Sequence, residues 1–334
     1  MQLLLSAKVC ARVADRLLAM RASLDIITLE TDGTFRRAGK VIDRDEVDPE
    51  IFWVSLDIFL SGLLPELFAR IGQGRKGKWA QMFFAGTDSP ELKQFAAKGI
   101  RITKNSAQSQ AIAEYVLCHA LSFLHPVEEQ RRAQKSHIWQ RIHFREIGDT
   151  RWIMVGSGSI GTEIARRLSP FGAHLTVFRR SRTPAPFAAE TYPVSDLIHH
   201  LPYADVVVLA CALNDETRDI ASTDFFSQIK KGSLLINIAR GGLVDEDALK
   251  AGLARSQPER AVLDVFKTEP LPENSWLWKH PQVRVTSHCS NAGSGVESRS
   301  DALFVENLRR YCAHEPLLYE ISSRELGVED FISA

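Results

Sequence analysis

The first hundred residues alternate short apolar runs with segments whose apolar positions recur at helical spacing. The runs are β-like in composition, and the segments between them repeat apolar residues every three or four positions. The pattern predicts strands at residues 2–6, 24–29, 51–55, 80–84 and 100–103, and helices at residues 9–20, 61–71 and 91–98. Such alternation indicates parallel βαβ units with helices on both faces of an open sheet.

A second series of the same kind begins at residue 151, after a long apolar helix predicted at residues 107–124. Strands are expected at residues 152–155, 173–178, 205–210, 233–238, 261–265 and 283–286, and helices at residues 160–169, 195–200, 222–229 and 245–255. Six strands with crossovers is the number that a Rossmann domain requires. The expected fold class is therefore α/β, with two doubly wound parallel-sheet domains.

The second series opens with a glycine-rich turn between a strand and a helix. Residues 151–161 read RWIMVGSGSIG, so Gly156, Gly158 and Gly161 follow an apolar run, and Ser159 and Ile160 begin the helical pattern. In a dinucleotide site these glycines allow a tight turn, close approach of a pyrophosphate, and packing of the helix on the strand. The free amides at the helix start offer an anion site. The alternative interpretation is an ordinary glycine-rich βα turn.

The end of the next predicted strand indicates which dinucleotide is bound. NAD sites usually place an acidic residue there to accept from the ribose hydroxyls, but this chain has Arg179, Arg180, Ser181 and Arg182. Guanidinium groups can bind a 2′-phosphate through two hydrogen bonds, whereas a carboxylate would repel it. The run therefore favours NADPH/NADP+, with NADH as a second cofactor. A solvated basic turn is the alternative.

Composition narrows the class of protein. Lys and Arg total 41, as do Asp and Glu, so the formal net charge is zero and no basic bias indicates nucleic acid or a membrane surface. The 334 residues suffice for about two domains. Five scattered cysteines without a C-x-x-C pair favour a reducing cytoplasm. His137 and His143 lack metal-ligand spacing, so no metal is expected.

Three further motifs follow in order. They are NIARGG at residues 237–242, LDVFKTEPLP at residues 263–272 and VTSH at residues 285–288. With the glycine turn, the chain resembles the D-isomer-specific 2-hydroxyacid dehydrogenase family, in particular its glyoxylate and hydroxypyruvate reductase-like members. The resemblance implies a Rossmann-type dinucleotide-binding domain at residues 105–291. It also implies a flavodoxin-like substrate (catalytic) domain made of residues 1–104 and 292–334.

The resemblance assigns roles to particular residues. Arg240 matches the substrate-orienting arginine, Glu269 its acidic partner and His288 the general acid/base, and cofactor contacts are implied at Ala239 and Asp264. The chemistry agrees, because reduction of a 2-keto carbonyl creates an alkoxide that a histidine can protonate. A carboxylate behind the imidazole fixes its tautomer and favours its charged form. An arginine can bind the substrate carboxylate and polarise the carbonyl.

The family also binds the substrate carboxylate through backbone amides of an N-terminal loop. The best positional match is a predicted loop that includes Ser55, Leu56 and Asp57. From the residues alone, a solvated or helix-capping aspartate is the favoured interpretation of Asp57, and a functional aspartate is the alternative. The chain departs from the family in having Ser287 where proline often precedes the histidine.

The expected activity is NADP(H)-dependent reduction of short 2-keto acids, of glyoxylate or hydroxypyruvate type, to D-2-hydroxy acids. A homodimer is expected, because members of the family are commonly dimers and the apolar helix at residues 107–124 could form the dimer surface. One alternative is a dinucleotide-sensing regulator, like the transcriptional corepressors that share this fold. Residues 316–334 would then be a C-terminal arm, which is short for a recruitment domain. A catalytically dead homologue is disfavoured, because Arg240, Glu269 and His288 are all present.

Overall fold

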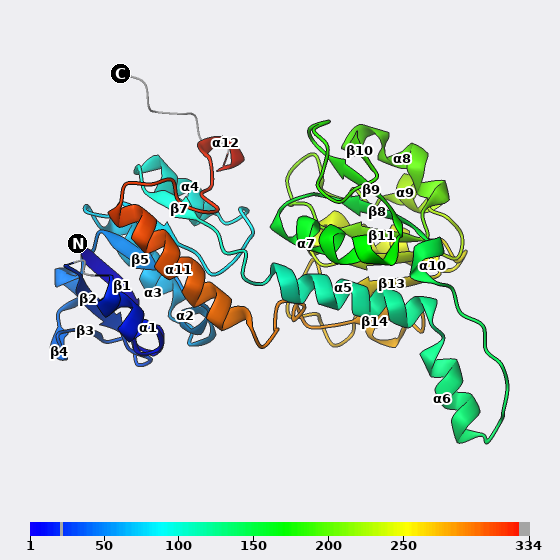
Figure 1. The fold of residues 1–334 in the computed structure, drawn as a ribbon, viewed down its shortest axis with the longest axis horizontal. Coiled ribbons are helices and arrows are strands. Elements are labelled where there is room, and N and C mark those ends of the chain that lie inside the picture. Colours follow the sequence, from blue (N-terminus) through cyan, green and yellow to red (C-terminus); the bar gives the residue numbers. More distant parts are fainter. Residues whose placement is uncertain (21–22, 327–334) are drawn as a thin grey trace. The chain divides into compact units, whose positions relative to one another are not determined.

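The computed structural model describes residues 1–20 and 23–326, and the chain forms two compact units (Figure 1). The N-terminal unit comprises residues 1–107 and the segment from residue 294 onward, and the central unit comprises residues 108–293. The sequence placed these divisions after residues 104 and 291. In the described part of the chain, no helix is long and apolar enough to cross a membrane.

Within its described residues, the N-terminal unit contains a seven-stranded sheet in the order β4-β3-β2-β1-β5-β6-β7. Its strands are β1 (Gln2–Ser6), β2 (Asp25–Leu29), β3 (Phe35–Arg37), β4 (Lys40–Ile42), β5 (Ile51–Trp53), β6 (Trp79–Gln81) and β7 (Arg101–Thr103). Its helices are α1 (Ala7–Ala19), α2 (Leu56–Leu60), α3 (Leu64–Gln73), α4 (Pro90–Ala97), α11 (Val296–Cys312) and α12 (Ser323–Leu326). The pairs β2–β3 and β3–β4 are antiparallel and the others parallel.

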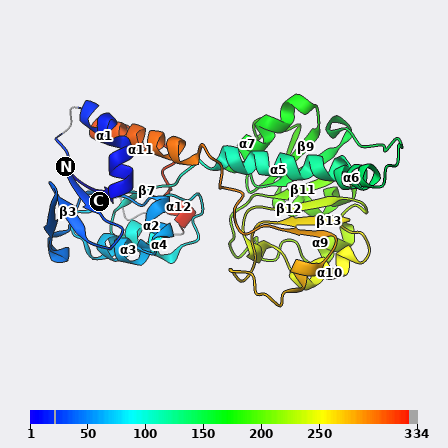
Figure 2. The ribbon, with the colours of Figure 1, turned by 90° about the horizontal axis from the view of Figure 1, so that it is seen from below.

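Apolar residues on both faces of the strands explain this arrangement. Successive side chains of β1 point to opposite faces, and both faces are covered. Leu3 and Leu5 pack with α1 and α11, whereas Leu4 packs with α2, α3 and α4, and all three leucines are fully buried. Figure 2 shows these two helix layers on opposite sides of the sheet.

In the central unit the described strands form a seven-stranded sheet that is parallel throughout, in the order β10-β9-β8-β11-β12-β13-β14. The strands are β8 (Arg151–Val155), β9 (His174–Arg179), β10 (Glu190–Pro193), β11 (Val206–Leu209), β12 (Leu234–Asn237), β13 (Arg260–Leu263) and β14 (Val283–Val285). The helices are α5 (Ser109–Leu124), α6 (Val127–Lys135), α7 (Ser159–Leu168), α8 (Leu197–His200), α9 (Thr223–Gln228) and α10 (Glu246–Leu253).

In the central unit, too, successive side chains of a strand point to opposite faces of the sheet, and each face is covered by its own helices. Trp152 and Met154 of β8 pack with α5 and α7, whereas Ile153 and Val155 pack with α8, α9 and α10. Figure 2 shows α5 and α7 above this sheet and α9 and α10 below it. The predicted fold class, two parallel-sheet α/β domains, is confirmed.

Several elements differ from the sequence prediction, which did not include helices α6 and α11. The segment expected to be a loop after residue 55 is helix α2, with Ser55 as its N-cap residue and Asp57 in its first turn. The hairpin β3–β4 and the edge strand β10 were not predicted. These strands are three or four residues long and only partly buried, so they lack the apolar run that marks a central strand.

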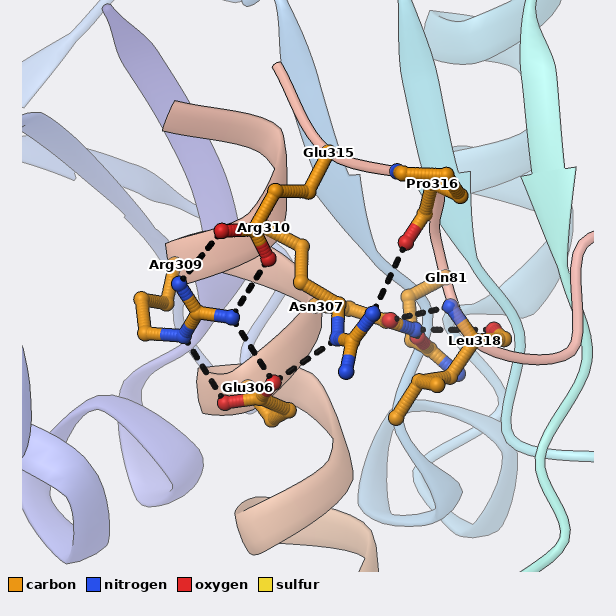
Figure 3. A network of polar contacts seen from close by, with 8 residues as sticks. All are labelled: Gln81, Glu306, Asn307, Arg309, Arg310, Glu315, Pro316 and Leu318. Carbon is orange, nitrogen blue, oxygen red and sulfur yellow. Dashed lines mark hydrogen bonds and ion pairs between the residues drawn. The ribbon is translucent and has the colours of Figure 1, made fainter. Parts of the chain in front are cut away.

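The C-terminal segment is held to the N-terminal unit by a buried amide network (Figure 3). Asn307 on α11 donates from Nδ2 to Gln81 Oε1 at 2.9 Å and to the Leu318 carbonyl at 3.1 Å, and its Oδ1 accepts from the Leu318 amide at 2.7 Å. The main chain of Ile321 then pairs with Ile102 of β7. The predicted arm therefore lies along the edge of the sheet at residues 319–321 and continues into α12, which contacts α4, and residues 327–334 lie outside the described residues.

We expect Asn307→Ala to destabilise the N-terminal unit, because it leaves the amide and carbonyl of Leu318 without their buried partner. A loss of about 2–4 kcal/mol corresponds to a melting temperature roughly 4 °C lower or more. The matched control is Glu306→Ala on the same helix, which removes only exposed ion pairs to Arg309 and Arg310 and costs about 0–1 kcal/mol. Equal thermal shifts in the two variants would contradict the role of the network.

Candidate active site

The glycine-rich turn after β8 is shaped by two close backbone approaches. Gly156 has φ of +105°, and a Cβ there would lie 2.5 Å from the Ala210 carbonyl oxygen. A Cβ on Gly161 would lie 2.6 Å from the carbonyl oxygen of Gly156. A side chain at either position would push the turn away from its neighbours. By contrast, no described atom lies within 4 Å of a Cβ built on Gly158.

Open space at Gly158 coincides with the start of α7. Gly158 is the N-cap residue and has no side chain to cap the first-turn amides, and Ser159 and Ile160 begin the helix. Such amides, with the positive end of the helix dipole, attract an anion. Nearby, burial raises the pKa of the Cys211 thiol to about 11, so this thiol stays uncharged. These features fit the pyrophosphate of a dinucleotide.

The basic run lies at the same edge of the sheet as the glycine turn. Arg179 is the last residue of β9, and Arg180 and Arg182 follow in an exposed turn with Ser181. Because β8 and β9 are parallel neighbours, their carboxyl ends lie side by side. The arginines are thus placed next to the predicted dinucleotide turn, where a ribose substituent would lie.

Arg240 lies on a turn that the buried side chain of Asn237 holds in place. Asn237 ends β12, donates from Nδ2 to the Arg240 carbonyl at 2.8 Å, and accepts the Ala239 amide at 3.1 Å. The Arg240 side chain also donates from Nη1 to the Ala239 carbonyl at 2.7 Å. A Cβ on Gly241 would lie 1.9 Å from the carbonyl carbon of Phe266. The Arg240 turn therefore packs directly on the turn that follows β13.

Glu269 and His288 form the predicted pair. His288 Nδ1 lies 2.7 Å from Glu269 Oε2, and Glu269 Oε1 accepts the Phe266 amide at 2.9 Å. A carboxylate at Nδ1 assigns the ring proton to that atom, which leaves Nε2 to exchange a proton with a substrate. Both side chains are partly exposed, so a ligand has access to them.

The loop that carries His288 is attached to the buried carboxylate of Asp264. Asp264 Oδ1 accepts from Thr286 Oγ1 at 2.6 Å and from the Cys289 amide at 2.9 Å, while Oδ2 accepts from the Ser290 amide at 3.0 Å. The carbonyl of Asp264 accepts the His288 amide at 2.8 Å. His288 itself has φ of +51°, a left-handed conformation that its neighbours must hold in place.

All these groups follow strands of one parallel sheet, so they gather at its carboxyl edge. They come after β8, β9, β12, β13 and β14, which is the edge where open α/β sheets bind ligands. Sequence reasoning missed the roles of Asn237 and Thr286 in holding these turns. For Asn237 the available signal was a polar residue that ends an apolar strand.

The predicted substrate residues Ser55, Leu56 and Asp57 belong to the N-terminal unit, where they follow β5 at the start of α2. Ser55 Oγ and Asp57 Oδ1 are buried and have no hydrogen-bond partner among the described residues. Asp57 lies in the first turn of α2 with Ser55 as the N-cap residue, so it is not the capping aspartate that the sequence had offered as an alternative. Substrate binding by this segment stays a prediction.

Known proteins share both the sequence and the fold. The chain is 28% identical over 224 residues to the glyoxylate/hydroxypyruvate reductase A of Citrobacter koseri, covering 65% of this chain and 72% of that protein. It is 29% identical over 233 residues to the D-3-phosphoglycerate dehydrogenase of Mycobacterium leprae, covering 69% of this chain but only 44% of that protein.

Among solved structures, the D-isomer specific 2-hydroxyacid dehydrogenase of Xanthobacter autotrophicus Py2, in complex with NADPH and MES, is similar with a TM-score of 0.76. The two chains are 27% identical, and the match covers 97% of this chain and 99% of that one. These comparisons favour the enzyme over the dinucleotide-sensing regulator.

The model of the D-isomer specific 2-hydroxyacid dehydrogenase NAD binding domain matches residues 117–290, more than half of the chain. This range contains the glycine turn, the arginine run and the Arg240, Glu269 and His288 motifs. The chain therefore belongs to the D-isomer specific 2-hydroxyacid dehydrogenase family, which confirms the predicted family and enzyme class.

Proposed function

We propose that this protein reduces a short 2-keto acid, of glyoxylate or hydroxypyruvate type, to the D-2-hydroxy acid, with NADPH as reductant. The single observation that carries the proposal is the His288–Glu269 pair, with Nδ1 and Oε2 2.7 Å apart at the edge where the glycine turn also lies. Glyoxylate/hydroxypyruvate reductase A of Citrobacter koseri supports this class of substrate.

In this proposal each residue acts on the substrate at a defined stage. A nicotinamide cofactor held by the glycine turn and the arginine run would supply the hydride for the reduction. Arg240 binds the substrate carboxylate and polarises the carbonyl oxygen, so negative charge develops beside a guanidinium. His288 then donates the proton on Nε2 to that oxygen, and Glu269 stabilises the imidazolium before the transfer. Ser55, Leu56 and Asp57 remain predicted contacts for the substrate carboxylate.

The cofactor preference rests on the arginines after β9. They occupy the position where an NAD site keeps a carboxylate, and the similar Xanthobacter enzyme was crystallised with NADPH. NADH remains the second candidate cofactor, because the arginines after β9 do not repel its uncharged ribose hydroxyls. The five cysteines, all described and free, support a reducing compartment, the cytoplasm.

The first test is a panel of glyoxylate, hydroxypyruvate and pyruvate assayed by NADPH oxidation, with D-3-phosphoglycerate and NADP+ as the competing substrate class. We expect turnover of a short keto acid.

His288→Ala should lower kcat by ~10²–10⁴-fold with NADPH binding unchanged, because only the proton donor is lost. Glu269→Gln should lower kcat by ~10-fold or more, because the imidazole loses the carboxylate that orients it and accepts from Nδ1. A kcat unchanged in Glu269→Gln would refute the assigned pairing.

A second test concerns the 2′-phosphate. A charge-assisted contact contributes roughly 1.5–3 kcal/mol. Arg179→Asp removes one such contact and adds repulsion, so kcat/KM for NADPH should fall by ~10-fold or more, while NADH is little affected. The measurement is the ratio of kcat/KM for the two cofactors at one ionic strength. A ratio that stays constant, or a wild-type enzyme that prefers NADH, would show the run to be a solvated turn.

We further propose that two copies associate through the arm at residues 127–146, which projects from the central unit (Figure 1). None of the residues of α6, all of which are described, is buried. The loop after it leaves Ile138 and Phe144 half exposed and Trp139 fully exposed. Clustered large apolar side chains on a protruding element are typical of a protein interface. The proposed partner is a second copy of the chain.

Sedimentation equilibrium should therefore give twice the mass of the chain. The double variant Ile138→Asp and Trp139→Asp should shift the protein toward the monomer at micromolar concentration, because charge is then placed in the apolar contact. The control is Leu18→Asp, at an exposed leucine on α1, which should leave the mass unchanged. A wild-type monomer, or a double variant that stays dimeric, would rule out the arm.

A further inference from the structure

Three side-chain oxygens connect helix α5 to the loop that carries His288. The hydroxyl of Tyr115, on α5, lies 2.6 Å from Thr286 Oγ1, and Thr286 Oγ1 lies 2.6 Å from Asp264 Oδ1. Tyr115 and Thr286 are 171 residues apart in the sequence, so only the fold brings them together. All three residues belong to the central unit.

The direction of each hydrogen bond follows from the number of protons available. The Asp264 carboxylate accepts two backbone amides, so the hydroxyl of Thr286 must donate to it. Thr286 has a single hydroxyl proton and therefore accepts from Tyr115, which must stay protonated. Burial raises the pKa of Tyr115, so its hydroxyl remains a donor throughout the neutral range. The ring of His119 packs against the Tyr115 ring in an edge-to-face contact, with the ring centroids 4.3 Å apart.

The same carboxylate determines where His288 lies. Asp264 binds the amides of Cys289 and Ser290 through its side chain and that of His288 through its carbonyl, and His288 has a left-handed backbone conformation. Thr286 is the side-chain donor in this set and lies two residues before His288. Losing that donor would leave Asp264 Oδ1 with the Cys289 amide as its remaining donor in a buried site and would weaken the attachment of the loop to the strand end.

We propose that Thr286 and Tyr115 are positioning residues that hold the His288 loop on Asp264 and so set the imidazole for proton transfer. The effect on kcat expected from this inference rests on the proposed function, the reduction of a keto acid. Helix α5 thereby fixes the geometry of the proton donor, although it carries none of the reacting groups. The expected kinetic signature is a loss of kcat with little change of KM, because Arg240 and not His288 holds the substrate.

The test compares Thr286→Val, which keeps the shape but lacks the hydroxyl, with Thr286→Ser, which keeps the hydroxyl. We expect kcat to fall by about 10-fold or more in Thr286→Val, with KM within about 3-fold, and Thr286→Ser to restore most of the rate. Tyr115→Phe should lower kcat several-fold in the wild type and have almost no further effect in Thr286→Val, because it acts through Thr286. Tyr203→Phe, at an exposed tyrosine of the same unit, is the control.

Hydrogen exchange of the peptide containing residues 286–290 measures the loop without any turnover. Exchange should accelerate in Thr286→Val and Tyr115→Phe and stay at the wild-type rate in Thr286→Ser and Tyr203→Phe. If the wild type reduces no keto acid while exchange responds in this way, the attachment of the loop stands and the proposed function fails. Unchanged exchange in both Thr286→Val and Tyr115→Phe would overturn the inference whatever the activity. If Thr286→Val does not fold, Tyr115→Phe alone decides between these results.

Discussion

The carboxylate of Asp264 is fully buried, and much of the candidate site is a consequence of that burial. A carboxylate removed from water is costly unless donors surround it. The loop after β14 supplies two amides and a hydroxyl, and it can do so only by turning sharply at His288. Satisfying one buried charge thus places the histidine that the reaction needs beside Glu269.

Close backbone contacts complete the site from the other strands. Gly241 brings the Arg240 turn against Phe266, and the Phe266 amide in turn binds Glu269. Gly156 likewise brings the turn after β8 against Ala210, the contact of Gly161 with the Gly156 carbonyl closes that same turn, and Gly158 leaves space beside the first amides of α7. The Gly241 and Gly156 contacts join turns that follow different strands, so the glycine turn and the Arg240 turn lie along one edge of this sheet. Fixed placement of the reacting groups is what proton and hydride transfer require.

Local features of the sequence were sufficient for most of the central unit. Gly156, Gly158 and Gly161 follow an apolar run within a few residues, and the pairing of Glu269 with His288 came from the family resemblance and agrees with the observed distance. The hairpin β3–β4 and helix α2 were missed, because short, partly exposed elements have no clear periodicity. The contact between Tyr115 and Thr286 was also out of reach. No local pattern relates a tyrosine on a helix to a threonine 171 residues later.

The most direct test of the account is to follow the hydride itself. NADPH carrying deuterium at the transferable C4 position is mixed with excess enzyme and the better of hydroxypyruvate and pyruvate, whose products have a stereocentre at C2, and the product is examined by mass spectrometry and chiral chromatography. The account predicts deuterium at C2 of the D-2-hydroxy acid in the wild type. It also predicts that this product forms ~10²–10⁴-fold more slowly at equal cofactor occupancy in His288→Ala. Bound cofactor that transfers deuterium to no keto acid, or a product of L configuration, would contradict it.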